Sequence, residues 1–213
     1  MSSPQIKICG IATPDALDAC MDARADFCGF VFYAPSPRYL TPGQAAELAA
    51  RAGTRIGKVG LFVNADDTEI GEATEAARLD AIQLHGSESP ERTAQVKARF
   101  QLPVWKALPI SCAADVERAL DYAKVADLIL FDAKTPKGAL PGGMGLTFDW
   151  SLLGGYRNQE DWGLAGGLDP SNIAQALRVT GAPLIDTSSG VESAPGVKDV
   201  DKIAAFCQAA RSI

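Results

Sequence analysis

The chain has few of the features that mark membrane, secreted or nucleic-acid-binding proteins. Its 213 residues contain no apolar run near the roughly 18 residues of a membrane span, and residues 1–5 lack the basic and apolar regions of a signal peptide. The net charge of -6 and the pI near 4.8 disfavour nucleic acid and anionic membranes as partners, because an acidic surface repels polyanions. The sequence therefore predicts a soluble, cytoplasmic protein that acts on small molecules.

Histidine is nearly absent, and the cysteines show no paired spacing. The five cysteines are odd in number and include no C-x-x-C pair, and His85 is the single histidine. This pattern argues against both a disulfide framework and a zinc site. We therefore expect reduced thiols and no bound metal.

The chain does contain a regular alternation of short β-rich segments with alanine-rich segments of helical period, and no break long enough for a linker. Such alternation is typical of βα units. Eight units favour a (β/α)8 TIM barrel, one α/β domain spanning residues 1–213, over a doubly wound sheet. Helices are expected to start where a capping residue precedes proline, at Thr13-Pro14, Thr41-Pro42, Ser89-Pro90 and Asp169-Pro170. The expected strands are Gln5–Cys9, Asp26–Phe32, Ile56–Val63, Ala81–Leu84, Val104–Leu108, Leu128–Asp132, Trp162–Ala165 and Leu184–Asp186.

Two of the expected strands end in residues suited to proton transfer. The first strand ends at Cys9, directly before Gly10, and the sixth ends at Asp132. In a parallel barrel the C-terminal ends of all strands meet at one face, where the active sites of these folds lie. A thiolate and a carboxyl group at that face could serve as base and acid.

Turns after the last two expected strands predict a phosphate site. Gly166 and Gly167 follow the seventh strand, and Ser188, Ser189 and Gly190 follow the eighth. Glycine lets the backbone approach an anion closely, while successive N–H groups and hydroxyls donate hydrogen bonds to its oxygens. Loops at these two strand ends hold phosphate in many barrel enzymes. We therefore expect a phosphorylated substrate.

A long glycine-rich segment, residues 133–147, follows the sixth expected strand. Long loops in compact domains usually act as lids or binding loops. The apolar residues Met144 and Leu146 indicate that this loop packs down on another part of the protein.

Eight segments spread along the chain form a characteristic combination: Lys7-Ile8-Cys9-Gly10-Ile11, Ser36-Pro37-Arg38, residues 59–64, Gln83-Leu84-His85-Gly86, Leu130-Phe131-Asp132, Phe148-Asp149-Trp150, residues 164–168 and residues 186–192. This combination resembles the phosphoribosylanthranilate isomerase family over essentially the whole chain. The resemblance implies the isomerisation of N-(5'-phosphoribosyl)anthranilate in tryptophan biosynthesis, an Amadori rearrangement that needs neither metal nor organic cofactor.

The resemblance also implies roles for single residues. Cys9 would be the general base that takes the proton from sugar C2, and Asp132 the general acid that protonates the ribose ring oxygen. Arg38 would bind the anthranilate carboxylate, a task suited to a planar bidentate donor. Phosphate would lie among Gly166, Gly167, Ser188, Ser189 and Gly190, with Asp186 orienting the pocket.

Other readings stay open. A histidine-pathway phosphoribosyl isomerase runs the same chemistry but uses carboxylates on strands one and five, whereas these strands end here in Cys9 and in Trp105-Lys106-Ala107-Leu108. A non-catalytic phosphate-binding barrel would need neither the base nor the acid. Met144 stands where the family commonly has threonine. The loop therefore lacks the threonine hydroxyl as a side-chain contact to the substrate. His85 is expected to line the pocket or to be structural.

Overall fold

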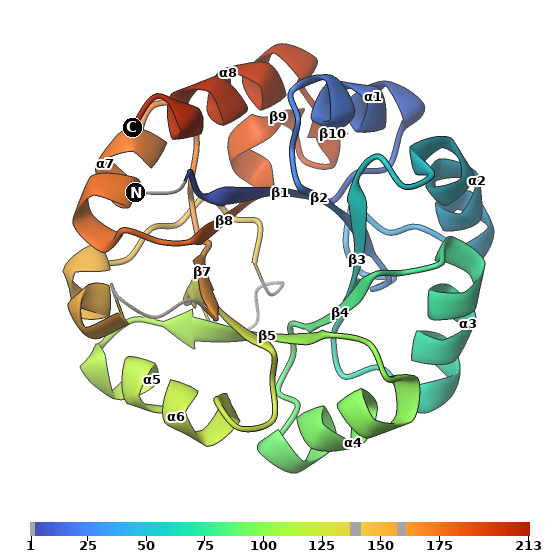
Figure 1. Ribbon diagram of the computed structural model, residues 1–213, viewed down its shortest axis with the longest axis horizontal. Helices are drawn as coiled ribbons and strands as arrows, with labels where there is room; N and C mark the ends of the chain where they lie inside the picture. The colour runs from blue at the N-terminus through green and yellow to red at the C-terminus, as the bar shows by residue number, and fades with distance from the viewer. Residues whose placement is uncertain (1–2, 137–141, 157–160) are drawn as a thin grey trace.

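The computed structural model describes residues 3–136, 142–156 and 161–213. Eight parallel strands form a closed barrel in which each strand pairs with the next and β8 pairs with β1 (Figure 1). This architecture confirms the expected (β/α)8 fold. The strands are β1 (Gln5–Cys9), β2 (Phe27–Val31), β3 (Gly57–Phe62), β4 (Ala81–Leu84), β5 (Val104–Ile110), β6 (Leu128–Ala133), β7 (Trp162–Leu164) and β8 (Leu184–Thr187).

Helices form a ring around the barrel (Figure 1). At the expected starts of α1, α2 and α4, the side chains of Thr13, Thr41 and Ser89 each accept a hydrogen bond from a backbone N–H of the first turn. The helices are α1 (Pro14–Asp22), α2 (Pro42–Ala52), α3 (Asp67–Ala77), α4 (Pro90–Phe100), α5 (Ala113–Glu117), α6 (Ala119–Tyr122), α7 (Ile173–Thr180) and α8 (Val200–Arg211), with 3-10 helices η1 (Trp150–Tyr156) and η2 (Ser189–Val191).

The expected helix start at Asp169-Pro170 is wrong by one turn. The Asp169 carboxylate accepts hydrogen bonds from the N–H groups of Ser171 and Asn172, which closes a polar turn, and α7 begins only at Ile173. A short antiparallel pair that the sequence pattern did not indicate, β9 (Glu192–Ala194) and β10 (Val197–Lys198), lies between β8 and α8.

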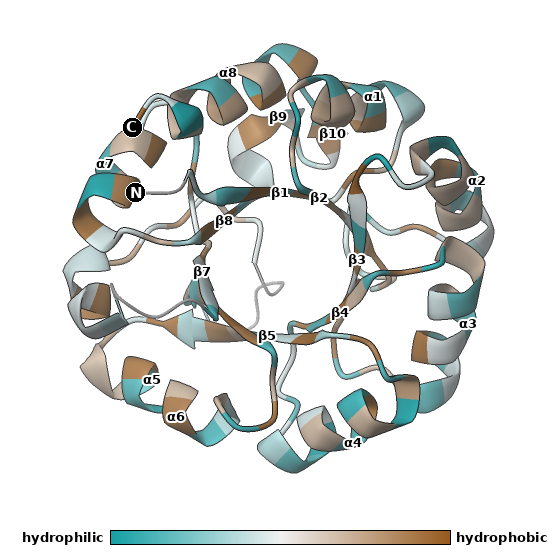
Figure 2. Ribbon diagram, viewed as in Figure 1, coloured by the Kyte–Doolittle hydropathy of each residue, from teal (hydrophilic) through white to brown (hydrophobic). Residues whose placement is uncertain are grey.

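In the described part of the chain, three buried apolar clusters support the barrel, the smallest of them formed by Cys9, Val31 and Leu61. The largest lies between the strands and the helices, and Figure 2 shows hydrophobic residues along the strands and interspersed with hydrophilic ones on the helices. Val59, Trp105 and Leu130 belong to a smaller buried cluster of strand residues. In the described ranges, no helix is both long and apolar enough to cross a membrane.

Three carboxylates brace the barrel at the N-terminal ends of its strands. Each precedes an even-numbered strand and accepts a hydrogen bond of 2.7 or 2.8 Å from a backbone N–H near the start of the preceding odd-numbered strand. Because these bonds join neighbouring strands, they hold the register on which the opposite face depends. The pairs are Asp26 with Ile6, Asp80 with Lys58, and Asp127 with Val104.

Candidate active site

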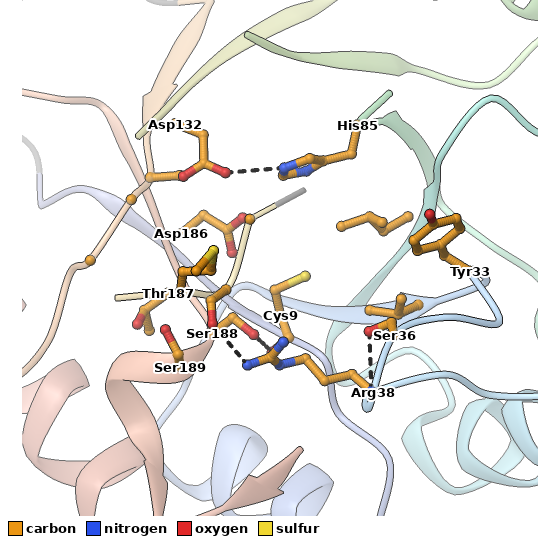
Figure 3. Close-up of a pocket in the computed structure, with 18 of the residues that line it drawn as sticks. Cys9, Tyr33, Ser36, Arg38, His85, Asp132, Asp186, Thr187, Ser188 and Ser189 are labelled. Carbon is orange, nitrogen blue, oxygen red and sulfur yellow. Dashed lines mark hydrogen bonds and ion pairs between the residues drawn. The ribbon is translucent and has the colours of Figure 1, made fainter. Parts of the chain in front are cut away.

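A cavity at the C-terminal ends of the strands brings together most of the predicted site residues. Figure 3 shows Cys9, Arg38, Asp132 and Asp186 around this cavity. Gly190 lines a neighbouring cleft instead, and Arg38 lines both the cavity and this cleft. The other predicted residues that line the main cavity are Gly166, Gly167, Ser188 and Ser189.

Cys9 lies at the end of β1 and is 5% exposed. Lys7 precedes it by two residues, so both side chains point to the same side of the strand, and Asp186 is the register partner of Lys7 on β8. The fully buried Lys7 Nζ lies 2.9 Å from Asp186 Oδ2. A β-carbon on Gly29 would lie 2.9 Å from Cys9 Sγ and 3.2 Å from Lys7 Nζ, so these two atoms are at most about 6 Å apart.

Burial and the charge of Lys7 act in opposite directions on the pKa of Cys9. Burial raises the pKa of the Cys9 thiol, and the neighbouring Lys7 ammonium opposes this shift. Burial acts to lower the pKa of Lys7, but Asp186 and Cys9 outweigh it, so the pKa of Lys7 lies above its usual value. Lys7 is therefore a cation next to the thiol, which favours the thiolate.

Asp132 belongs to a hydrogen-bonded chain of three side chains. Its Oδ1 accepts the N–H of Ala133 at 2.8 Å, and its Oδ2 lies 3.0 Å from His85 Nε2. The amide nitrogen of the buried Gln83 is 3.0 Å from His85 Nδ1. With this amide orientation Nδ1 accepts, so Nε2 carries the ring proton and donates to Asp132. Among the described residues, the buried Gln83 Oε1 has no hydrogen-bond partner.

Arg38 is held by a bidentate ion pair with Glu192. Its Nε and Nη2 donate to the two carboxylate oxygens at 2.7 and 2.8 Å, and Nη2 also lies 3.3 Å from the Gly143 carbonyl. Lys198 Nζ donates to the same carboxylate at 2.7 Å. Burial acts to raise the pKa of Glu192, but these two cations outweigh it and lower that pKa. The guanidinium is thus oriented before any ligand binds, with Nη1 facing the loop at Gly143.

The turns after β7 and β8 have the tight backbone that an anion site needs. Gly166 and Gly167 adopt positive φ angles of 86° and 60°, a conformation that side chains disfavour. The Ser188 hydroxyl donates to the Cys9 carbonyl at 3.0 Å. This bond joins β8 to the end of β1, and the role of Ser188 in phosphate binding stays a prediction. Ser189 lines the cavity beside it.

The glycines of the loop after β6, rather than its apolar side chains, lie against the site. A β-carbon on Gly142 would be 3.0 Å from His85 Nε2 and 3.2 Å from Asp132 Oδ2, so the loop backbone closely covers both groups. Met144 and Leu146 remain 49% and 40% exposed. The loop thus packs on the site, as the sequence predicted, but it does so mainly through its glycine backbone rather than through these two apolar side chains, of which Met144 lines the cavity. Residues 137–141 of this loop lie outside the described ranges.

Comparison with known proteins decides the family. Residues 6–209 match the family model of N-(5'phosphoribosyl)anthranilate (PRA) isomerase. The chain belongs to this isomerase family. It is 52% identical over 208 residues to the N-(5'-phosphoribosyl)anthranilate isomerase of Paramagnetospirillum magneticum, covering 97% of each chain. It is 54% identical over 202 residues to that of Paracoccus denitrificans, covering 94% of each.

Solved structures agree with this assignment. The phosphoribosyl anthranilate isomerase of Thermotoga maritima superposes with a TM-score of 0.88 at 37% identity, covering 99% of this chain and 100% of that one. A phosphoribosyl anthranilate isomerase solved with reduced 1-(o-carboxyphenylamino)-1-deoxyribulose 5-phosphate gives 0.86 at 35%, with the same coverage. Membership of the isomerase family favours its reaction over the histidine-pathway reaction and over a non-catalytic barrel.

Sequence reasoning missed the partners that hold this isomerase site together. Glu192 was part of a quoted motif, yet its ion pair with Arg38 spans 154 positions of sequence. Lys7 opened another motif, but its contact with Asp186 spans 179 positions. A basic residue two positions before a strand-end thiol is the signal that could have identified Lys7, because alternate strand residues share a face.

Proposed function

We propose that this member of the isomerase family converts N-(5'-phosphoribosyl)anthranilate to 1-(2-carboxyphenylamino)-1-deoxyribulose 5-phosphate with Cys9 as general base and Asp132 as general acid, as a cytoplasmic step of tryptophan biosynthesis. The observation that carries these roles is the placement of both residues on one cavity. Asp132 gives a proton to the ribose ring oxygen, and the ring opens to a Schiff base. The Cys9 thiolate then removes the C2 proton, and the resulting enol tautomerises to the aminoketose.

Formation of the thiolate is the role of Lys7 in this scheme. A buried thiol is a poor base because its pKa is raised. Asp186 holds the Lys7 ammonium in place. This ammonium stabilises the thiolate of Cys9, and the Lys7 side chain itself does not obstruct the substrate. Lys7 therefore acts as a positioning residue for the general base.

Asp132 must carry a proton to act as an acid, and Gln83 and His85 can accommodate that form. If the Gln83 amide turns over, its carbonyl accepts the proton on His85 Nδ1, and Nε2 then accepts the Asp132 hydroxyl. The turn pairs the buried Oε1 that lacks a partner in the described structure and moves the amide nitrogen into the position that Oε1 leaves. The orientation of the Gln83 amide and the protonation of Asp132 are thus coupled through the hydrogen bonds of His85.

The remaining predicted residues bind substrate in this proposal. The phosphate lies on the backbone at Gly166, Gly167 and Gly190 with Ser189, while Arg38 donates from Nη1 to the anthranilate carboxylate. Asp186 lines the cavity, and its Oδ1 is buried with no partner among the described residues. An unpaired buried acceptor is costly, so we assign Oδ1 to a hydroxyl of the substrate sugar.

The test follows the loss of fluorescence of freshly formed phosphoribosylanthranilate in the presence of purified protein. Cys9→Ala and Asp132→Asn should each lower kcat by about 10²–10⁴ while product binding survives. The matched control is Cys112→Ala, which removes an exposed thiol and should leave kcat unchanged. Near-wild-type turnover in either site variant would remove that residue from the mechanism.

A further inference from the structure

A buried ion pair lies beside the site but has no part in the proposed chemistry. Lys106 on β5 and Glu88 in the β4–α4 loop are separated by 2.9 Å, and their side chains are 2% and 3% exposed. Burying two charges is expensive, so the surroundings of this pair must compensate for the loss of water.

The Glu88 carboxylate occupies an anion-binding nest. Its Oε1 accepts the backbone N–H of Asn64 at 2.7 Å, and its Oε2 accepts the N–H of Gly86 at 2.9 Å as well as the Lys106 ammonium. Backbone N–H groups that converge with a lysine are the arrangement proteins use to hold phosphate and other anions. Here the anion is a side chain of the same chain.

Lys106 is fully engaged by this arrangement. Besides Glu88, its Nζ donates to the carbonyls of Leu84 at 3.2 Å and Gly86 at 2.8 Å. A β-carbon on Gly86 would lie 2.6 Å from Asn64 Oδ1 and 2.8 Å from Glu88 Oε1, so the nest packs closely against this glycine. The nest is therefore shaped around a carboxylate and leaves Lys106 without a donor for a substrate anion.

The nest lies across the barrel mouth from the proposed phosphate cradle. It is built from the residues that follow β3 and β4 and from Lys106 within β5, whereas the cradle is at β7 and β8, on the opposite side of the ring of eight strands (Figure 1). Asn64, Gly86 and Lys106 also line a second cavity, which shares His85 and Asp132 with the active-site cavity. An anion bound there would lie next to the reacting groups.

We propose that Glu88 is a tethered anion that fills a second anion-binding nest and so restricts the barrel mouth to substrates with a single phosphate. This inference rests on the proposed function for the position of that single phosphate. A second anionic group on a substrate would meet a carboxylate at β3–β5 instead of N–H groups and an ammonium.

The test asks whether an added anion replaces the missing side chain. In Glu88→Ala, thermal unfolding is followed at constant ionic strength while chloride is exchanged for sodium formate. The melting temperature should be several degrees below wild type and should rise saturably with formate, because ligand bound to the folded state stabilises it. If Glu88→Ala does not fold in chloride, the yield of refolding from urea with and without formate gives the same readout.

Two controls make the result specific. Glu88→Gln fills the nest with a neutral group of the same shape and should respond to formate no more than wild type. Glu117→Ala removes an exposed carboxylate and matches the change in net charge. A formate response of Glu88→Ala no larger than that of Glu88→Gln would overturn the tethered-anion assignment.

The link to substrate choice is tested by counting bound inorganic phosphate calorimetrically. Wild type should bind one phosphate, which product displaces, and Glu88→Ala should bind two, one of which product does not displace. A single site in both proteins would overturn the exclusion of a second phosphate. Failure of wild type to bind any phosphate would refute the proposed cradle at β7 and β8, and the formate response would still decide the role of Glu88.

Discussion

Removal of the Lys7 charge should suppress ionisation of Cys9. Lys7 Nζ lies at most about 6 Å from Cys9 Sγ, and two unit charges at that distance interact by about 3 kcal/mol at an effective dielectric constant of about 20. Asp186 carries the opposite charge and cancels part of this energy, so the net effect on the thiolate is smaller. We therefore expect Lys7→Met to lower the thiolate population at neutral pH by roughly tenfold to a hundredfold.

The assay measures the thiolate directly. Iodoacetamide alkylates thiolates, and the modification rate of the Cys9 peptide can be followed by mass spectrometry from about pH 6 to 10. Cys112 is the exposed thiol and is replaced by serine in every protein compared. Burial raises the pKa of Cys28 to about 12 and that of Cys207 to about 11, so these thiols react slowly over this range.

A second buried lysine provides the control. Lys58 on β3 forms a 2.8 Å ion pair with Asp80 and donates to the Gly53 carbonyl. Lys58→Met removes a buried ammonium from that pair and should leave Cys9 alkylation unchanged. Equal alkylation rates of Cys9 in Lys7→Met and wild type, with both proteins folded, would refute the assignment of Lys7 to the base. Lys7→Met should also cost stability, at most about 3–5 kcal/mol, because Asp186 loses its partner.

Three further predictions concern binding, pH and the barrel. Arg38→Ala should raise KM more than it lowers kcat, because substrate and transition state share the carboxylate it contacts; an unchanged KM with a much lower kcat would place Arg38 at the reacting centre. Since Cys9 must be deprotonated and burial raises its pKa, kcat/KM should still rise with pH above about 8.5; a profile level from pH 6 would exclude this thiol as base. Asp127→Ala should lower the free energy of unfolding by about 1–3 kcal/mol through the unpaired N–H of Val104, measured by urea denaturation, with kcat nearly unchanged.

The strands were predictable because their signal is local. β1 and β4 have the bounds read from hydrophobic runs, and the other strands differ only at their ends. A buried parallel strand shows as a short apolar run between turn residues. The predicted start of α7 was wrong because Asp169 resembles a helix N-cap residue in the sequence, whereas its carboxylate accepts the hydrogen bonds of a turn that precedes the helix. The same residue types form a helix N-cap and a polar turn before a helix, so only the folded structure distinguishes the two.

The sequence predicts which residues form the candidate site, but not which charged side chains pair with each other there. Strand-end residues meet at one face whenever a parallel barrel closes, which is why Cys9, Asp132 and Asp186 line one cavity. The partner of each charge depends on the register and twist of distant strands. Nothing local to Arg38 indicates Glu192, and nothing local to Glu88 indicates Lys106.

These pairings explain how an acidic chain can hold an anionic substrate. Four buried basic side chains near the barrel mouth are each bound to a carboxylate, namely Lys7 with Asp186, Arg38 and Lys198 with Glu192, and Lys106 with Glu88. Three carboxylates face these four positive charges, because Arg38 and Lys198 share Glu192, so the set leaves one positive charge at that pair. A phosphate in the proposed cradle would then be held by this remaining charge together with backbone dipoles, whose donors are fixed in space. In the proposal above, selectivity for one phosphate comes from the turns after β7 and β8 and from Glu88, whose carboxylate accepts the N–H groups of Asn64 and Gly86 after β3 and β4.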